Sequence, residues 1–274
     1  TLAAIKQHGG ARVLFVNRLP DGHIDPYHLE QLIVENPESL VCLMHANNEI
    51  GNLLPVKTVA ALCRKHGALF HSDMVQTIGK FHTDIRALGP DFAVASAHKF
   101  HGPKGVGFMF VKSRAGMRPF IAGGAQERSL RAGTENVSGI AGMAAALEWI
   151  SQDLDESRAL ITSLKDSLIS GIRSGLPEIG FNGDPDRSSL HTIVNLRLPD
   201  YLDPDLVLPR LEQYGICASS GSACSSGSHK GSHVLRALDP EEKHPSLRIS
   251  FSKFNTHQDV DHLLGALKKL IEYR

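Results

Sequence analysis

The fold of this chain is indicated most clearly by residues 68–107, ALFHSDMVQTIGKFHTDIRALGPDFAVASAHKFHGPKGVG. This stretch contains two short apolar runs, ALFHSD (68–73) and DFAVASA (91–97), and polar residues follow each of them. Nearly continuous apolar runs are typical of strands that are buried on both faces of a parallel or mixed sheet. In such sheets ligands bind beyond the carboxyl ends of the strands. We therefore expect the polar residues after the two runs to face a site.

Apolar runs and helical patterns alternate on both sides of this stretch. We predict strands over 11–17, 39–45, 68–73, 91–97 and 106–112, and helices over 25–36 and 56–67. Asp25 is expected to cap the first helix at its N-terminus, and Gly67 to end the second. Alternating strands and helices predict an α/β fold whose sheet is covered by helices on both faces.

The pattern changes after about residue 137 to two long helices, followed by a mixture of strands and helices. We predict strands over 192–198 and 246–252, and helices over 205–215 and 259–273. This part is typical of a second, smaller α+β domain. The expected division is therefore a large domain over 1–150 and a small C-terminal domain over 151–274.

The composition excludes several classes of protein. Hydrophobic residues make up 42% of the 274 residues and charged residues 21%, as in globular proteins. Lys plus Arg equals Asp plus Glu at 29 each, so no net charge favours nucleic acid or an anionic membrane as a partner. No apolar run has the length of a transmembrane helix. The four cysteines are scattered without a disulfide framework, which favours a cytoplasmic location, or an organelle matrix in a eukaryote.

The polar residues at the strand ends have the side-chain types that a pyridoxal phosphate (PLP) site requires. Asp73 ends one apolar run, and Ser96, His98 and Lys99 lie at or just past the end of the other. PLP enzymes need a lysine that binds the cofactor aldehyde and a carboxylate that pairs with the pyridinium nitrogen. Hydroxyl and imidazole groups beside the lysine can bind the phosphate. Each of these side-chain types is also common elsewhere: Asp in helix caps, Lys in solvated loops and His in structural roles. The types alone therefore do not establish a PLP site.

Five motifs occur in an order that resembles a known family. They are HANNEIG (45–51), HSDMVQTIGK (71–80), SAHKFHGPKGVGF (96–108), GGAQERSLRAGTEN (123–136) and SSGSACSS (219–226). In this order they resemble the class V, fold-type I PLP enzymes, and most closely the cysteine desulfurases of the NifS and IscS type. The resemblance implies a PLP-dependent transferase-like fold. Its mostly parallel sheet, of the seven-stranded type, lies between helices, and a smaller α+β domain follows.

The resemblance also implies roles around the cofactor. Lys99 matches the lysine that binds PLP and moves a proton to and from the substrate α-carbon. The other implied cofactor contacts are Asp73 with the pyridine nitrogen, Gln76 with the phenolic oxygen, Ser96 and His98 with the phosphate, and Thr134 with the phosphate of the partner subunit in a homodimer. Asn48 matches an amide near the cofactor oxygen and the substrate carboxylate. Arg248 matches the guanidinium that binds this carboxylate, since arginine offers a flat bidentate fork.

Cys224 distinguishes a desulfurase from other class V enzymes. It lies in SSGSACSSGSHKGS (219–232), where glycine and serine are typical of a mobile tether. By the resemblance, its thiolate takes sulfur from L-cysteine, keeps it as a persulfide and leaves L-alanine. An acceptor protein, such as an iron–sulfur scaffold, would then receive the sulfur for cluster or thiocofactor assembly.

Three alternatives remain open in the sequence. A selenocysteine lyase would use the same chemistry with selenium, although SSGSAC is nearer the desulfurase pattern. A class V aminotransferase would have no use for a mobile Cys224. A truncated scaffold would keep the fold without turnover. The family normally has a further N-terminal portion with a phosphate-binding Gly/Thr loop and a histidine that stacks on the ring. Neither motif is present in this chain, so we expect the N-terminal part of the large domain to be absent.

A zinc site in the same region is disfavoured. The side-chain types of Cys217, Cys224, His229 and His233 suit zinc, but six residues separate the two cysteines, more than in structural zinc sites. We therefore expect no metal site.

Overall fold

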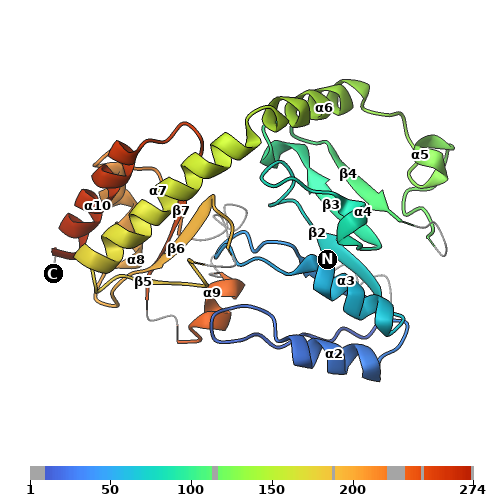
Figure 1. The fold of residues 1–274 in the computed structure, drawn as a ribbon, viewed down its shortest axis with the longest axis horizontal. Helices are drawn as coiled ribbons and strands as arrows, with labels where there is room; N and C mark the ends of the chain where they lie inside the picture. Colours follow the sequence, from blue (N-terminus) through green and yellow to red (C-terminus); the bar gives the residue numbers. More distant parts are fainter. Residues whose placement is uncertain (1–9, 113–116, 187–188, 221–231, 242–243, 273–274) are drawn as a thin grey trace.

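The computed structural model of the chain describes residues 10–112, 117–186, 189–220, 232–241 and 244–272. These residues form two sheets, one in each half of the molecule (Figure 1). The first sheet consists of β1 (Leu40–Met44), β2 (Leu69–Asp73), β3 (Phe92–Ser96) and β4 (Gly107–Val111), in that order. The second consists of β5 (Gly180–Phe181), β6 (Ile193–Arg197) and β7 (Ser246–Ser250).

The register of the first sheet brings three strand ends to one edge. β1, β2 and β3 run parallel, with Met44 opposite Asp73 and Asp73 opposite Val94. β4 returns antiparallel to β3, and Ser96 lies opposite Gly107. A Cβ atom at Gly107 would lie 2.3 Å from the Ala95 carbonyl oxygen, so only glycine permits this close return. The sheet is therefore mixed, with the carboxyl ends of its three parallel strands side by side.

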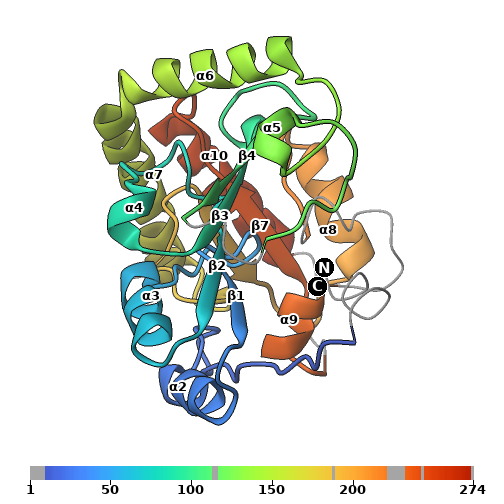
Figure 2. The ribbon, with the colours of Figure 1, turned by 90° about the vertical axis from the view of Figure 1, so that its right-hand side faces the viewer.

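Three helices lie beside the first sheet (Figure 2). They are α2 (Pro26–Glu35), α3 (Val56–Lys65) and α4 (Ile85–Leu88). The Asp25 carboxylate accepts hydrogen bonds from the backbone N–H groups of Tyr27 and His28, which confirms the cap of α2. Gly67 follows α3 with a φ of +76°, a left-handed conformation that glycine adopts without strain. Phe70, which is fully buried, anchors the core beneath these helices.

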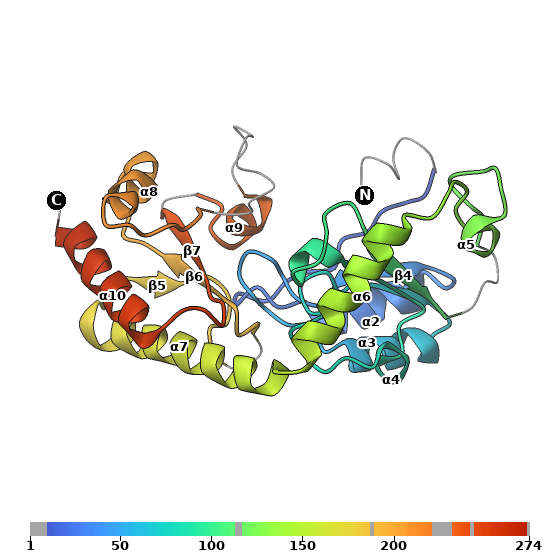
Figure 3. The same cartoon turned by 90° about the horizontal axis from the view of Figure 1, so that it is seen from above.

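Two long helices run along the length of the molecule (Figure 3). α6 (Val137–Ser151) lies over the first half and follows the short α5 (Gln126–Ser129), whereas α7 (Leu154–Gly175) lies over the second. α7 packs with α10 (His257–Glu272) on the second sheet, and Leu164, Leu196 and Leu267 are fully buried between them. Two shorter helices, α8 (Pro204–Glu212) and α9 (His233–Leu238), complete this half.

Each half has its own hydrophobic core. One core gathers buried side chains between Leu29 and Leu154, and the other gathers those between Ile161 and Leu270. The prediction of an α/β fold with a mixed sheet is confirmed, and the described residues contribute four strands to the expected larger sheet. The division into domains 1–150 and 151–274 stays a prediction that the two cores support. Among the helices of the described residues, none is both long and apolar enough to cross a membrane.

The strand predicted over 11–17 is wrong. These residues form neither a helix nor a strand in the described chain, and only an isolated bridge joins the neighbouring Arg18 to Ile24. Phe15 is 71% exposed, so this apolar run is not buried in the described chain. Nearby contacts hold the segment instead, since the Asn17 N–H donates to His28 Nδ1 at 2.8 Å. A strand requires a neighbouring strand as well as an apolar pattern.

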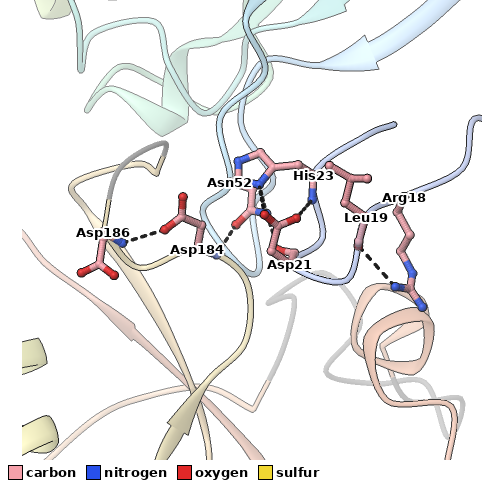
Figure 4. A network of polar contacts seen from close by, with 7 residues as sticks. All are labelled: Arg18, Leu19, Asp21, His23, Asn52, Asp184 and Asp186. Atoms are coloured by element: carbon pink, nitrogen blue, oxygen red, sulfur yellow. Dashed lines mark hydrogen bonds and ion pairs between the residues drawn. The ribbon is translucent and has the colours of Figure 1, made fainter. Parts of the chain in front are cut away.

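Polar contacts connect the two halves (Figure 4). The Asn52 side chain is 6% exposed; its Nδ2 donates to the Asp21 carbonyl oxygen at 2.8 Å. Its Oδ1 accepts the backbone N–H of Asp184, from the second half, at 2.9 Å. The Asp184 carboxylate in turn accepts the backbone N–H of Asp186 at 3.0 Å. One amide therefore satisfies backbone groups from both halves.

Candidate active site

The segment after β2 turns sharply at the carboxyl edge of the sheet. Asp73 ends the strand, and its Oδ1 accepts the backbone N–H of Val75 at 2.9 Å. The buried Thr77 hydroxyl lies 2.9 Å from His45 Nδ1, which connects this turn to the end of β1. Gln76 lies between Asp73 and Thr77 in the sequence and is 8% exposed. The turn thus holds a carboxylate and a buried amide at the edge where ligands bind in such sheets.

The segment after β3 holds the predicted lysine. The short helix η1 (Ala97–Lys99) follows the strand directly. The Ser96 hydroxyl lies 2.8 Å from His98 Nδ1, so the two predicted phosphate ligands contact one another. His98 is exposed and Lys99 is half-buried. Phe100, which is 1% exposed, anchors this turn in the core.

A cavity of about 280 Å³ lies where the two halves meet. Four of the predicted site residues line it, namely Asn48, Gln76, Lys99 and Arg248. They come from the segments after β1, β2 and β3 and from β7, so four separate parts of the chain meet there. Asp73, Ser96 and His98 lie at the same sheet edge but do not line this cavity.

Arg248 connects the second sheet to the cavity. Its Nη1 donates to the Asn48 carbonyl oxygen at 3.0 Å, which orients the guanidinium across the boundary between the halves. Its backbone N–H donates to the carbonyl oxygen of Ser219 at 2.6 Å. Cys224 lies outside the described residues. Ser219, which precedes it in the same Gly/Ser segment, therefore begins that segment beside the cavity-lining arginine.

The structure does not bring Thr134 together with these residues. It is exposed in the loop between α5 and α6 and does not line the cavity. The implied role of Thr134 concerns a partner subunit, so it stays a prediction.

The cavity lining also includes charged and titratable side chains that the sequence did not single out, among them Lys80, Arg158 and His191. Lys80 ends the HSDMVQTIGK motif, so its place in that motif was the available signal. Arg158 and His191 lie far along the chain and carried no local signal. The Arg158 Cζ lies 5.0 Å from the ring centroid of Phe81, and that ring meets the His191 imidazole edge-on at 5.3 Å.

Burial and neighbouring cations set the ionisation of two of these groups. Burial, with smaller effects from Lys99 and Arg248, lowers the pKa of Lys80 to about 8. Burial, followed by the charges of Arg158, Lys80 and Lys165, lowers the pKa of His191 to about 4. At neutral pH Lys80 is therefore mostly protonated and His191 is neutral.

The residues present fit PLP. No carboxylate of the described residues pairs with the Lys99 ammonium, so this amine is available to a cofactor aldehyde. The Asp73 carboxylate ends the neighbouring parallel strand, and the Ser96 and His98 pair offers two polar groups beside it. An amine, a carboxylate, and a hydroxyl with an imidazole at one sheet edge are side-chain types that the cofactor needs.

Comparison with known proteins identifies the family. A family model for class-V aminotransferases matches residues 1–263. The cysteine desulfurase IscS of Clostridium botulinum is 37% identical over 268 residues, which are 97% of this chain and 67% of that protein. The cysteine desulfurase of Gluconacetobacter diazotrophicus is 37% identical over 272 residues, which are 98% of this chain and 67% of that protein. The chain therefore spans about two thirds of the length of these relatives.

Solved structures agree with this result. A NifS-like protein from Rickettsia africae superposes with a TM-score of 0.85 at 30% identity, over 99% of this chain and 72% of that chain. SspA, solved in complex with cysteine, superposes with a TM-score of 0.74 at 26% identity, over 93% of this chain and 70% of that chain. The chain belongs to the class-V aminotransferase family, within the group of IscS- and NifS-like cysteine desulfurases.

Proposed function

We propose that the protein is a PLP-dependent cysteine desulfurase, which removes sulfur from L-cysteine and leaves L-alanine. The observation that carries the proposal is the meeting of Lys99, Gln76, Asn48 and Arg248 around one cavity at the carboxyl edge of the sheet. The desulfurase names of the relatives support it, and so does the cysteine complex of SspA, which favours the same substrate.

The groups at the sheet edge have distinct roles toward the cofactor. When bound, PLP would supply an electron sink for the bonds at the substrate α-carbon. The Asp73 carboxylate would hold a proton on the ring nitrogen, and Gln76 would donate to the phenolic oxygen. Ser96 and His98 would bind the phosphate. Lys99 would hold the cofactor and then move a proton at the α-carbon as acid and base.

The substrate carboxylate would bind Arg248. The hydrogen bond from Arg248 Nη1 to the Asn48 carbonyl oxygen restrains the guanidinium before substrate arrives, which lowers the entropy cost of binding. Asn48 would orient the same carboxylate from the other half of the molecule.

Cys224 would accept the sulfur. Its thiolate would form the persulfide, and an acceptor protein such as an iron–sulfur scaffold would then receive the sulfur. Ser219, which precedes Cys224 in the Gly/Ser segment, pairs with the backbone of Arg248, so this segment starts beside the arginine that would bind the substrate carboxylate. We further propose that the enzyme acts as a homodimer in which Thr134 reaches the phosphate bound by the partner subunit.

The role of Lys99 is tested by spectroscopy. We expect Lys99→Ala to abolish the visible absorbance band of the bound cofactor and to lower the rate of sulfide release at least about 100-fold, since the variant has no amine to hold the cofactor. Lys104→Ala, at an exposed lysine of the SAHKFHGPKGVGF motif, should keep both the absorbance band and the rate of sulfide release. A normal band in Lys99→Ala would contradict the proposal.

The role of Cys224 is tested by separating cofactor binding from sulfur transfer. We expect Cys224→Ser to keep the absorbance band but to stop sulfide and persulfide formation from L-cysteine, because a hydroxyl does not take up sulfur. Cys217→Ser, at an exposed cysteine, is the matched control, and this variant should keep the sulfur yield of the unaltered chain. An unchanged yield in Cys224→Ser would remove this residue from the mechanism.

Alanine release from cysteine compared with selenocysteine separates a desulfurase from a selenocysteine lyase.

A further inference from the structure

We infer that Lys80 is a positioning residue of this site, which fixes the side-chain amide of Gln76 with its NH₂ group turned toward the cavity. The inference rests on the proposed function, because it assigns Lys80 a task in the binding of the cofactor. Lys80 belongs to no part of the mechanism described above.

The backbone brings Lys80 to the cavity through Gly79. Gly79 has a φ of +77°, and a Cβ atom there would lie 2.7 Å from the Cβ of Phe100. Glycine is therefore required both for the left-handed turn and for the close approach to the residue that follows Lys99. The turn after β2 thus places Lys80 beside the segment that carries the cofactor-binding amine.

The contact between Lys80 and Gln76 determines which way the amide points. Lys80 Nζ donates to Gln76 Oε1 at 3.2 Å. An ammonium group can only donate, so the amide oxygen faces Lys80 and the NH₂ group faces away from it. Gln76 is 8% exposed and lines the cavity, so its NH₂ group remains as the donor for a ligand there. An oxygen that carries negative charge, such as the phenolic oxygen of PLP, fits this donor.

Few other groups compensate the charge of Lys80. No carboxylate of the described residues pairs with it. The other titratable or charged groups that line the cavity are Lys99, His101, Asp153, Arg158, His191, Arg248 and Lys253. Among these, Asp153 is already bound by Lys253, with a distance of 2.6 Å between carboxylate oxygen and Nζ. Gln76 Oε1 is therefore the acceptor that holds Lys80 in place.

A fixed donor changes how the bound cofactor titrates. A hydrogen bond from the Gln76 NH₂ group stabilises the charged form of the phenolic oxygen, and this lowers the pH midpoint of the cofactor's absorbance change. Without Lys80 the amide is free to turn, and its oxygen then faces the cofactor oxygen in part of the molecules. The midpoint should rise.

The experiment measures this midpoint in the full chain reconstituted with PLP. We expect Lys80→Met to raise the midpoint by about one pH unit. In Lys80→Arg, which keeps a cationic donor, the midpoint should lie within a few tenths of a pH unit, roughly, of that of the unaltered chain. If Lys80 acts through Gln76, the shift caused by Lys80→Met should fall to less than about half in a Gln76→Leu background. Should Lys80→Met fail to fold, Lys80→Ala serves for the same comparison.

The possible outcomes separate this inference from the proposed function. If the unaltered chain shows no cofactor band, the proposed function is overturned and the inference with it. If the band is present and Lys80→Met leaves its midpoint unchanged, the inference alone is overturned. A shift of full size in the Gln76→Leu background also overturns it, because Lys80 would then act by its charge and not by orienting Gln76.

Discussion

Burial controls the protonation of a histidine beside the cavity. His191 is 7% exposed, and its Nδ1 has no hydrogen-bond partner among the described residues. Its neighbours include Arg158 and Lys80, whose charges act in the same direction as burial. The pKa of His191 is therefore about 4 in the folded chain, compared with about 6.5 for an unfolded histidine.

This difference predicts a loss of stability in acid. Between pH 6.5 and pH 4 the unfolded chain binds a proton at His191 that the folded chain does not, so the free energy of unfolding falls as the pH is lowered. The loss from this group is on the order of 2–3 kcal/mol when pH 4 is reached. Urea unfolding measures how far the free energy of unfolding falls between pH 7.5 and pH 4.5. This fall should be smaller in His191→Gln than in the unaltered chain by about 2 kcal/mol.

The exposed His82 provides the control for this prediction. Its ring lies 3.1 Å from the Asp155 carboxylate, and its side chain is 65% exposed. His82→Gln should leave the acid dependence nearly unchanged. An equal fall in His191→Gln and in the unaltered chain would show that His191 does not stay neutral in the folded state.

Two glycines, one before β2 and one after it, have left-handed backbones in different surroundings. Gly67 and Gly79 have nearly the same φ, +76° and +77°. Nothing lies within 4 Å of a Cβ atom built at Gly67, whereas a Cβ at Gly79 would clash with Phe100. The pair therefore separates the cost of a left-handed backbone from the cost of a steric clash.

We expect the two alanine substitutions to differ. Gly67→Ala should lower the free energy of unfolding by about 1–2 kcal/mol, the cost of a left-handed alanine. Gly79→Ala should lower it by a further 1–3 kcal/mol or so, because η1 or the turn after β2 must move. Urea unfolding of both variants measures the difference. Equal losses would mean that the turn relaxes freely, and the positions of Lys80 and Gln76 would then not depend on Gly79.

At the scale of the whole molecule, a few polar contacts hold the two halves around the cavity. The residues that follow β1 make several of them. Besides Asn52, the Glu49 carbonyl oxygen accepts from Asn195 Nδ2 at 3.1 Å, and the Asn48 carbonyl oxygen accepts from Arg248. Asn195 is 1% exposed, so this contact is shielded from water. The cavity walls are therefore positioned by hydrogen bonds of segments that lie far apart in sequence.

Removal of one such contact should lower the stability of the whole molecule. Asn52→Ala leaves the Asp184 N–H and the Asp21 carbonyl oxygen without their partner, so the free energy of unfolding should fall by about 1–3 kcal/mol. Amide exchange at Asp184 should become faster. Asn17→Ala, at an exposed asparagine of the N-terminal segment, should change stability by less than about 0.5 kcal/mol. Equal stability of the two variants would show that the contacts of Asn52 do not hold the halves together.

The local sequence determined the elements that carry the residues proposed to bind the cofactor. The apolar runs that end at Asp73 and before His98 correctly predicted β2 and β3, because burial on both faces requires such runs. Parallel pairing then places the two carboxyl ends at one edge. The helix cap at Asp25 was equally local, because the side chain binds backbone groups only two and three residues away.

Tertiary structure decided which residues meet at the cavity. Arg248, Arg158 and His191 reach Lys80 and Lys99 only because the second sheet and α7 close against the first half. That closure depends on long-range packing and on hydrogen bonds such as those of Asn52, which no pattern within a short stretch encodes. The strand predicted over 11–17 failed for the same reason: apolar character is a local property, but pairing requires a neighbour that only the folded chain can provide.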